Sequence, residues 1–193
     1  MEARRVVLAC EAHAGAPLVD AVDARIAELL ATIPYSSSMT VALGFDAADL
    51  ARPPVGFGFL VPKKERRRLV ACTWVGTKFS HRVPAGTVVA RCFLGGMEDA
   101  GVLDESDRQV LAAVTDELAD IAGVRAVPRF SRIFRWPRSM AQYTVGHPQR
   151  LAELEARAAQ APGFYLAGNA YQGIGIPDCI RMGRAAAEKI LTS

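Results

Sequence analysis

YLAGNAYQGIGIPDCI, the stretch from Tyr165 to Ile180, decides the fold because it predicts a short buried strand, then a glycine-rich turn, then a helix. Pro177 stands at the expected first residue of that helix, where a proline loses no hydrogen bond. The first N–H groups of a helix lack internal partners and carry partial positive charge, so they can bind electron-rich oxygens. Glycines let a flat or phosphorylated ligand come close to the backbone. The stretch predicts either a ligand site or a tight strand-to-helix connection of the kind found in any α/β protein.

The apolar patterns near both ends of the chain predict strands and helices that belong to one layer. An apolar strand is expected at residues 5–10 and another at residues 164–167. Helices are expected at residues 20–32, 148–160 and 176–191. The face that the first of these helices turns to the core is expected to carry Ile26, Leu29, Leu30 and Ile33. We expect the first strand to lie beside the last strand and its helix.

The middle of the chain predicts one antiparallel sheet with a covering helix. Its strands are expected at residues 36–45, 59–61, 69–74, 87–94 and 127–136. The helix is expected at residues 104–122, with Asp104 as its N-terminal cap and Gly123 as the left-handed residue that ends it. The whole pattern indicates an α/β (α+β) protein.

The composition indicates a globular protein of one or two small domains. The chain has 193 residues, of which 51% are hydrophobic and 22% are charged, so disorder is not expected. A net charge of +3 is too small to predict a nucleic-acid partner. The apolar runs are shorter than the about 20 residues of a membrane-spanning helix, and the first run ends at Glu11, too early for an export signal. We therefore expect a cytoplasmic protein with at most peripheral contact with a membrane.

The cysteines and histidines do not predict a metal site. The four cysteines form no C-x-x-C pair, and the three histidines lie far apart without metal-ligand spacing. Buried, reduced thiols are the favoured interpretation of Cys10, Cys72, Cys92 and Cys179. The sequence shows no P-loop and no Ser–His–Asp arrangement, so neither hydrolysis nor phosphoryl transfer is predicted.

Three segments, in order along the chain, resemble one enzyme family. GNAYQGIGIPDCI resembles the closing flavin-contacting motif of bacterial protoporphyrinogen and coproporphyrinogen oxidases, which are FAD enzymes of the flavin amine oxidase superfamily. GFGFLVP, continuing through CTWVGTKFSHRVPAGTVVARCFLGG, and RIFRWPRSMAQYTVGH resemble segments of the same family. The family opens with a G-x-G-x-x-G fingerprint that binds the FAD pyrophosphate, and this sequence contains none followed by a helix. The chain therefore resembles the C-terminal portion of such an enzyme.

The resemblance implies a division of the chain into two parts. Residues 1–33 and 138–193 would form the C-terminal part of an FAD-binding domain, and residues 34–137 a substrate-binding domain. The implied fold combines a partial FAD-binding layer, built from both chain ends, with an antiparallel-sheet substrate domain and its covering helices.

The resemblance also implies cofactor contacts in the closing motif. Ile174, Gly175 and Ile176 would lie beside the isoalloxazine ring, where backbone amides stabilise the negative charge that grows as flavin accepts hydride. Gly168 and Asn169 would approach the ribityl or phosphate region. The alternatives are a packed helix start for the first three residues and an ordinary turn residue for Asn169.

Three aromatic or apolar residues are further candidates. The resemblance implies that Trp136 lies near the flavin, and core packing is the alternative. Leu60 and Phe79 match positions that pack against the tetrapyrrole rings, and the alternative is that both belong to the core of the sheet.

A basic series of period three precedes the closing helices. Its members can bind the propionates of a tetrapyrrole, line a nucleic-acid groove or form a solvated sheet edge, and the last interpretation is favoured. The series consists of Arg129, Arg132, Arg135 and Arg138.

The function implied is that of an FAD-dependent oxidase that converts protoporphyrinogen IX or coproporphyrinogen III into the porphyrin with oxygen as acceptor. Because the fingerprint is missing, we expect the isolated chain to bind FAD weakly or not at all, and an N-terminal FAD-domain chain to be its partner. The alternative is a non-catalytic porphyrin-binding module or an inactive truncated remnant, and a nucleic-acid partner is not expected.

Overall fold

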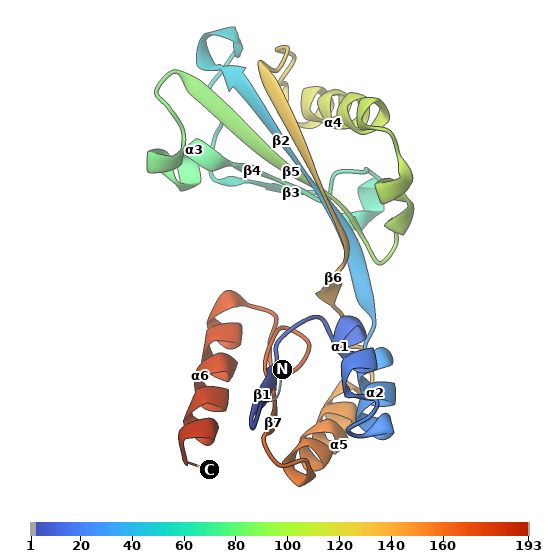
Figure 1. Cartoon of the computed structure of the whole chain (residues 1–193). Coiled ribbons are helices and arrows are strands. Elements are labelled where there is room, and N and C mark those ends of the chain that lie inside the picture. The colour runs from blue at the N-terminus through green and yellow to red at the C-terminus, as the bar shows by residue number, and fades with distance from the viewer. Residues whose placement is uncertain (1–2, 193) are drawn as a thin grey trace. The chain divides into compact units, whose positions relative to one another are not determined.

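The structure is a computed structural model that describes residues 3–192, and the chain divides into two compact units (Figure 1). The first unit takes the residues up to Tyr35 and those from Ser139 onward, and the second is Ser36–Arg138. The division implied by the resemblance lies after residues 33 and 137, and the binding roles that it gives to the two parts stay predictions.

The first unit is built on two parallel strands from opposite ends of the chain. Strand β1 (Val6–Leu8) pairs with β7 (Phe164–Leu166), in a register that places Val6 opposite Phe164. This pairing confirms that the first strand lies beside the last. Both strands lie between helix α6 (Ile176–Thr192) and the pair formed by α1 (Ala12–Val19) and α2 (Ala24–Ala31), as Figure 1 shows.

Helix α2 begins where its sequence provides a cap. The Asp23 carboxylate accepts hydrogen bonds from the backbone N–H groups of Arg25 and Ile26, so the helix starts later than the predicted residue 20. The four predicted core positions are all buried, at 0%, 5%, 0% and 2% exposure for Ile26, Leu29, Leu30 and Ile33. Helix α5 (His147–Gln160) contacts α2 and contributes Leu154, which is fully buried.

Helix α1 was not predicted, because Gly15 and Pro17 interrupt its pattern. Its glycine has a packing reason, since a Cβ at Gly15 would lie 2.7 Å from Cδ2 of Leu8 in the neighbouring strand. Cys10, two residues before the start of this helix, is exposed, so the prediction of a buried thiol is wrong there.

The second unit is one five-stranded sheet, ordered β3-β4-β5-β2-β6. The pairs β3–β4, β4–β5 and β5–β2 are antiparallel, as predicted. The strands are β2 (Tyr35–Asp46), β3 (Gly58–Leu60), β4 (Ala71–Trp74), β5 (Thr87–Gly96) and β6 (Phe130–Ala141), with the short helix α3 (Val75–Lys78) after β4.

Helix α4 (Asp107–Ala122) covers one face of this sheet. Its buried residues Val110, Val114 and Leu118 pack in one core with the strand residues Val41 and Leu43. Gly123 has φ of 69° and ends the helix as predicted.

The N-terminal cap of α4 was predicted wrongly. Ser106, not Asp104, caps the helix, because its hydroxyl accepts from the Gln109 N–H while the Gln109 side chain accepts from the Ser106 N–H. Asp104 instead closes the 3₁₀ turn Ala100–Asp104.

Candidate functional site

The turn between β7 and α6 has a backbone that only glycine adopts easily. Gly168 and Gly173 have φ of 130° and 123°, in the region where residues with a Cβ are strained. A Cβ at Gly173 would also lie 2.4 Å from a carboxylate oxygen of Asp178. Gly168 and Gly173 are therefore required by the shape of the turn.

The start of α6 presents free backbone donors. Among the described residues, the N–H groups of Ile174, Gly175 and Ile176 have no hydrogen-bond partner. The side chains of Ile174 and Ile176 are 56% and 78% exposed, so a packed helix start is wrong for these two positions. The Gly175 carbonyl accepts from the N–H of Cys179 at 3.0 Å, which makes Gly175 the residue that opens the helix. The arrangement can donate hydrogen bonds to an electron-rich edge of a ligand.

Tyr143 holds this turn and was missed by the sequence analysis. Its hydroxyl donates to the Asn169 carbonyl at 2.9 Å and accepts from the Gly173 N–H at 2.8 Å. Burial raises the pKa of the Tyr143 hydroxyl, which therefore stays a neutral donor and acceptor. The Asn169 side chain is near the Ser139 carbonyl, at 3.5 Å.

His147 packs against the ring of Tyr143 and was also missed by the sequence analysis. The two rings are stacked, with centroids 4.0 Å apart, and the His147 Nε2 lies 3.0 Å from the Tyr171 carbonyl. Both residues belong to the segment RIFRWPRSMAQYTVGH, so membership of a resembling motif was the signal that could have identified them.

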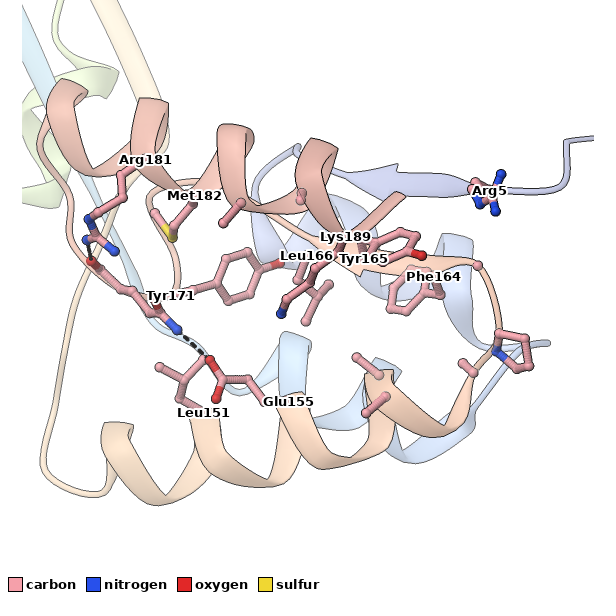
Figure 2. Close-up of a pocket in the computed structure, with 18 of the residues that line it drawn as sticks. Arg5, Leu151, Glu155, Phe164, Tyr165, Leu166, Tyr171, Arg181, Met182 and Lys189 are labelled. Carbon is pink, nitrogen blue, oxygen red and sulfur yellow. Dashed lines mark hydrogen bonds between the residues drawn. The ribbon is translucent and has the colours of Figure 1, made fainter. Parts of the chain in front are cut away.

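A cleft of about 920 Å³ runs beside β7 in the first unit, between α5 and α6 (Figure 2). Phe164, Leu166 and Met182 give it apolar walls, and Arg5 and Lys189 add positive charge. At the end near the turn, hydrogen bonds join Arg181 to the Gln172 carbonyl and the Gln172 side chain to Glu155. The described residues that line the cleft include none of the predicted cofactor residues.

In the second unit, the sheet face opposite α4 carries exposed aromatic side chains. Side chains alternate along a strand, so the burial of Cys92 and Leu94 against α4 places Arg91 and Phe93 on the opposite face. Ile133 packs against the same core, so its neighbours in β6 alternate likewise. We call this surface the exposed sheet face and define it by Leu60, Arg91, Phe93, Phe130, Arg132, Phe134 and Trp136.

The predicted residues of this face are not core residues. Trp136 is 48% exposed and stacks with Phe134, at 6.3 Å between ring centroids, so the core-packing alternative for it is wrong. Leu60 is 82% exposed on the edge strand β3, and core packing is wrong there too. Contacts of either residue with a ligand stay predictions.

Phe79 lies apart from the strands, directly after α3. Its ring is flanked by the cations of Arg82, at 4.5 Å, and Lys78, at 5.6 Å from the ring centroid. Phe79 is partly buried, and its role toward a substrate stays a prediction.

The basic series does not act as one set. Arg129 pairs with Asp46, and Arg135 pairs with Asp107 at 2.7 Å while donating to the carbonyls of Leu103 and Glu105. Arg132 donates to the adjacent carbonyl of Ser131. Two of the four guanidinium groups are thus committed to carboxylates of the chain itself.

Two classes of feature are not found in the described part of the chain. No group of three or more His, Cys, Asp or Glu side chains is placed to hold a metal ion. None of the described helices combines the length and the hydropathy that crossing a bilayer requires. A cytoplasmic location stays a prediction.

The comparisons with known proteins agree on one family. The chain matches the family described as flavin containing amine oxidoreductase over residues 1–191. It is 37% identical over 158 residues to a coproporphyrinogen III oxidase of Bacillus subtilis (strain 168), which covers 81% of this chain and 34% of the relative. It is 32% identical over 192 residues to a coproporphyrinogen III oxidase of Propionibacterium freudenreichii subsp. freudenreichii, with 99% and 36% covered. The chain therefore spans about a third of the length of these curated relatives.

Solved structures share the same fold. A protein from Exiguobacterium sp. 255-15, provisionally assigned as a protoporphyrinogen oxidase, matches with a TM-score of 0.81 and 32% identity, over 96% of this chain and 40% of that one. Cyclohexylamine oxidase from Brevibacterium oxydans IH-35A matches with a TM-score of 0.71 and 17% identity, over 98% of this chain and 44% of that one. The second likeness concerns the fold alone.

Proposed function

Because the chain belongs to the family of flavin-containing amine oxidoreductases, whose pattern it matches over residues 1–191, we propose that it is part of an oxidase of porphyrin biosynthesis. The reaction proposed is the oxidation of coproporphyrinogen III or protoporphyrinogen IX to the porphyrin, with oxygen as acceptor. The names of the relatives support this substrate class. The observation that carries the proposal is the exposed start of α6, where three successive N–H groups are free.

The cofactor proposed is FAD, the flavin form implied by the resemblance. The chain has groups that suit two parts of FAD. The free donors of Ile174, Gly175 and Ile176 suit the electron-rich edge of the ring, and Gly168 and Asn169 suit the polar chain attached to the ring. A bound flavin supplies the acceptor for the two electrons that leave the substrate. The backbone donors supply fixed partial positive charge, which needs no rearrangement during the reaction.

The substrate surface proposed lies in the second unit. A tetrapyrrole is a large flat apolar ring, and the half-exposed rings of Trp136 and Phe134 together with Leu60 suit it. Phe79 is proposed as a further apolar contact, although its ring already lies against two cations.

The partner proposed is a chain or segment that carries the dinucleotide-binding fold. In the described residues, β1 and β7 form a sheet of two strands, with Val6 and Val7 49% and 39% exposed. A two-stranded sheet is marginally stable alone, so further strands beside it would add stability. The cleft beside β7, with its apolar walls and positive charge, offers additional surface for such a partner.

A non-catalytic porphyrin-binding protein is the alternative. One observation favours it: the exposed sheet face lies wholly within the second unit, so it could bind a tetrapyrrole without any dinucleotide-binding fold.

A chimera tests the proposed oxidase. This chain would replace the matching third of the Bacillus subtilis relative, and the purified chimera would be examined for a flavin absorption band at about 450 nm. Formation of fluorescent porphyrin from coproporphyrinogen III or protoporphyrinogen IX is the expected result. A chimera that retains flavin but oxidises neither substrate contradicts the proposal, and porphyrin binding by that chimera would then favour the alternative.

A further inference from the structure

The exposed sheet face carries two cations that no carboxylate of the described residues neutralises: Arg132, which donates to the Ser131 carbonyl, and Arg91. Arg91 lies in β5, opposite Thr73 of β4 and Ala42 of β2. Both neighbours are small and uncharged, so the Arg91 side chain extends over an uncharged part of the sheet. Its guanidinium carbon lies 5.2 Å from the centroid of the Phe93 ring, two residues along on the same face.

Arg91 differs from three of the four arginines that the sequence analysis singled out. Arg129 and Arg135 each pair with a carboxylate of the chain and Arg132 donates to a carbonyl. The Arg91 side chain has neither an ion pair nor a hydrogen bond to the described residues. The Nε of Arg91 is moreover buried and has no hydrogen-bond partner in the described part of the protein. Buried donors without a partner are rare in proteins, because each one loses its hydrogen bond to water.

These two observations indicate a missing anionic partner. A partly buried guanidinium supported by an aromatic ring is well suited to bind a carboxylate through two parallel hydrogen bonds. The carboxylate must belong to a ligand that lies against Phe93 and the neighbouring aromatic side chains, which requires a molecule that is both apolar and acidic.

We propose that Arg91 binds a carboxylate side chain of the tetrapyrrole and so determines that the substrate must be a free acid. The inference rests on the proposed function. It makes Arg91 a specificity-determining residue: the exposed sheet face supplies the apolar contact, which any tetrapyrrole satisfies, and the guanidinium supplies the contact that an ester of the same ring cannot match.

The test compares an acid with its ester on the full chain. Quenching of tryptophan fluorescence would measure the affinity for coproporphyrin III and for its tetramethyl ester. The variants are Arg91→Gln, which removes the charge, and Arg91→Lys, which keeps it. Arg108→Gln is the matched control, because Arg108 is exposed on α4, the helix that covers the other face of the sheet. Circular dichroism would establish that each variant is folded.

The expected result is a loss of about ten-fold or more in affinity for the acid in Arg91→Gln, with the ester unaffected. Arg91→Lys should lose less, and Arg108→Gln should match the unaltered chain. The inference about Arg91 would be overturned, with the proposed function left standing, if Arg91→Gln bound the acid as tightly as the unaltered chain does. Equal losses of affinity for the acid and for the ester would have the same consequence. If the unaltered chain binds neither porphyrin, the proposed tetrapyrrole surface fails and Arg91 loses its role with it.

Discussion

The hydroxyl of Tyr143 accepts a 2.8 Å hydrogen bond from the backbone N–H of Gly173, 30 residues further along the chain. The same hydroxyl donates to the Asn169 carbonyl, so one side chain ties both ends of the turn that precedes α6. The free donors at the start of α6 follow directly after Gly173. Tyr143 therefore acts as a positioning residue for the proposed cofactor contact.

Replacing Tyr143 with Phe should loosen this turn. The change removes two hydrogen bonds of a partly exposed hydroxyl, so we expect the free energy of unfolding to fall by about 1 kcal/mol. Urea denaturation of the chain would measure it. Tyr143→Leu, which also removes the stack on His147, should lose more. A Phe variant as unstable as the Leu variant would show that the stack contributes nothing, and a Phe variant as stable as the unaltered chain would contradict the role of the hydroxyl.

Replacing Gly175 with Trp should remove flavin from the chimera described above. A Cβ at Gly175 would already lie 3.1 Å from the Asp178 carboxylate, and an indole at this exposed position would cover the free donors. The absorbance of the purified protein at about 450 nm measures how much flavin is retained. Ala187→Trp, on an exposed position of α6, is the control and should retain flavin. Undiminished flavin in Gly175→Trp would remove Gly175 from the site.

The cap of α4 can be tested by a pair of substitutions. Ser106→Ala should lower the free energy of unfolding by about 1 kcal/mol, because it leaves the Gln109 N–H without its acceptor. Asp104→Ala should change it by less than about 0.5 kcal/mol, because Asp104 lies outside the helix. Equal losses in the two variants, measured by thermal or urea unfolding, would contradict the assignment of Ser106 as the cap.

Acid should weaken the contact between Glu105 and Arg68. The guanidinium binds both carboxylate oxygens, at 2.6 and 2.8 Å, and holds the pKa of Glu105 below its ordinary value of 4.5. Because the pKa of Glu105 is lower in the folded chain than in the unfolded chain, the ion pair stabilises the fold fully above about pH 4.5. This stabilisation is lost as the pH falls through the pKa of Glu105 in the folded chain. Because the pair is partly exposed, its contribution is under about 1 kcal/mol.

The variant Glu105→Gln isolates this effect. It should be less stable than the unaltered chain at pH 7, and the difference should shrink as the pH falls below about 4.5 and Glu105 becomes protonated. Glu65→Gln, at an exposed position, is the control and should show no such dependence. A stability difference that does not shrink with acid would rule out the charge as its cause.

Three of the four thiols should react at very different rates. Cys10 is exposed, whereas Cys72 and Cys92 are buried, with their sulfurs 3.8 Å apart. The hydrogen bond with Cys72 and burial raise the pKa of the Cys92 thiol, which disfavours the reactive thiolate. A thiol reagent at pH 8 should label Cys10 at once and the buried pair only after unfolding. Fast labelling of Cys72 in the folded chain would contradict the packing of the sheet.

The sequence by itself determined the kinds of element and much of their order. Periodicity predicted the buried face of α2 and the strands of the antiparallel sheet, because a hydrophobic face repeats with the geometry of its own element. Glycine and proline located the turn before α6, since few other residues tolerate its backbone.

Only the tertiary structure decided which side chains have partners. Arg129 pairs with Asp46, 83 residues away, whereas Arg91 contacts Phe93 and no carboxylate among the described residues. Spacing along the chain predicts neither contact. The exposure of Trp136 and Leu60 likewise depends on which face of the sheet α4 covers. A local pattern fixes the period of an element, but partners far along the chain are fixed by strand register and packing, and these exist only in the folded protein.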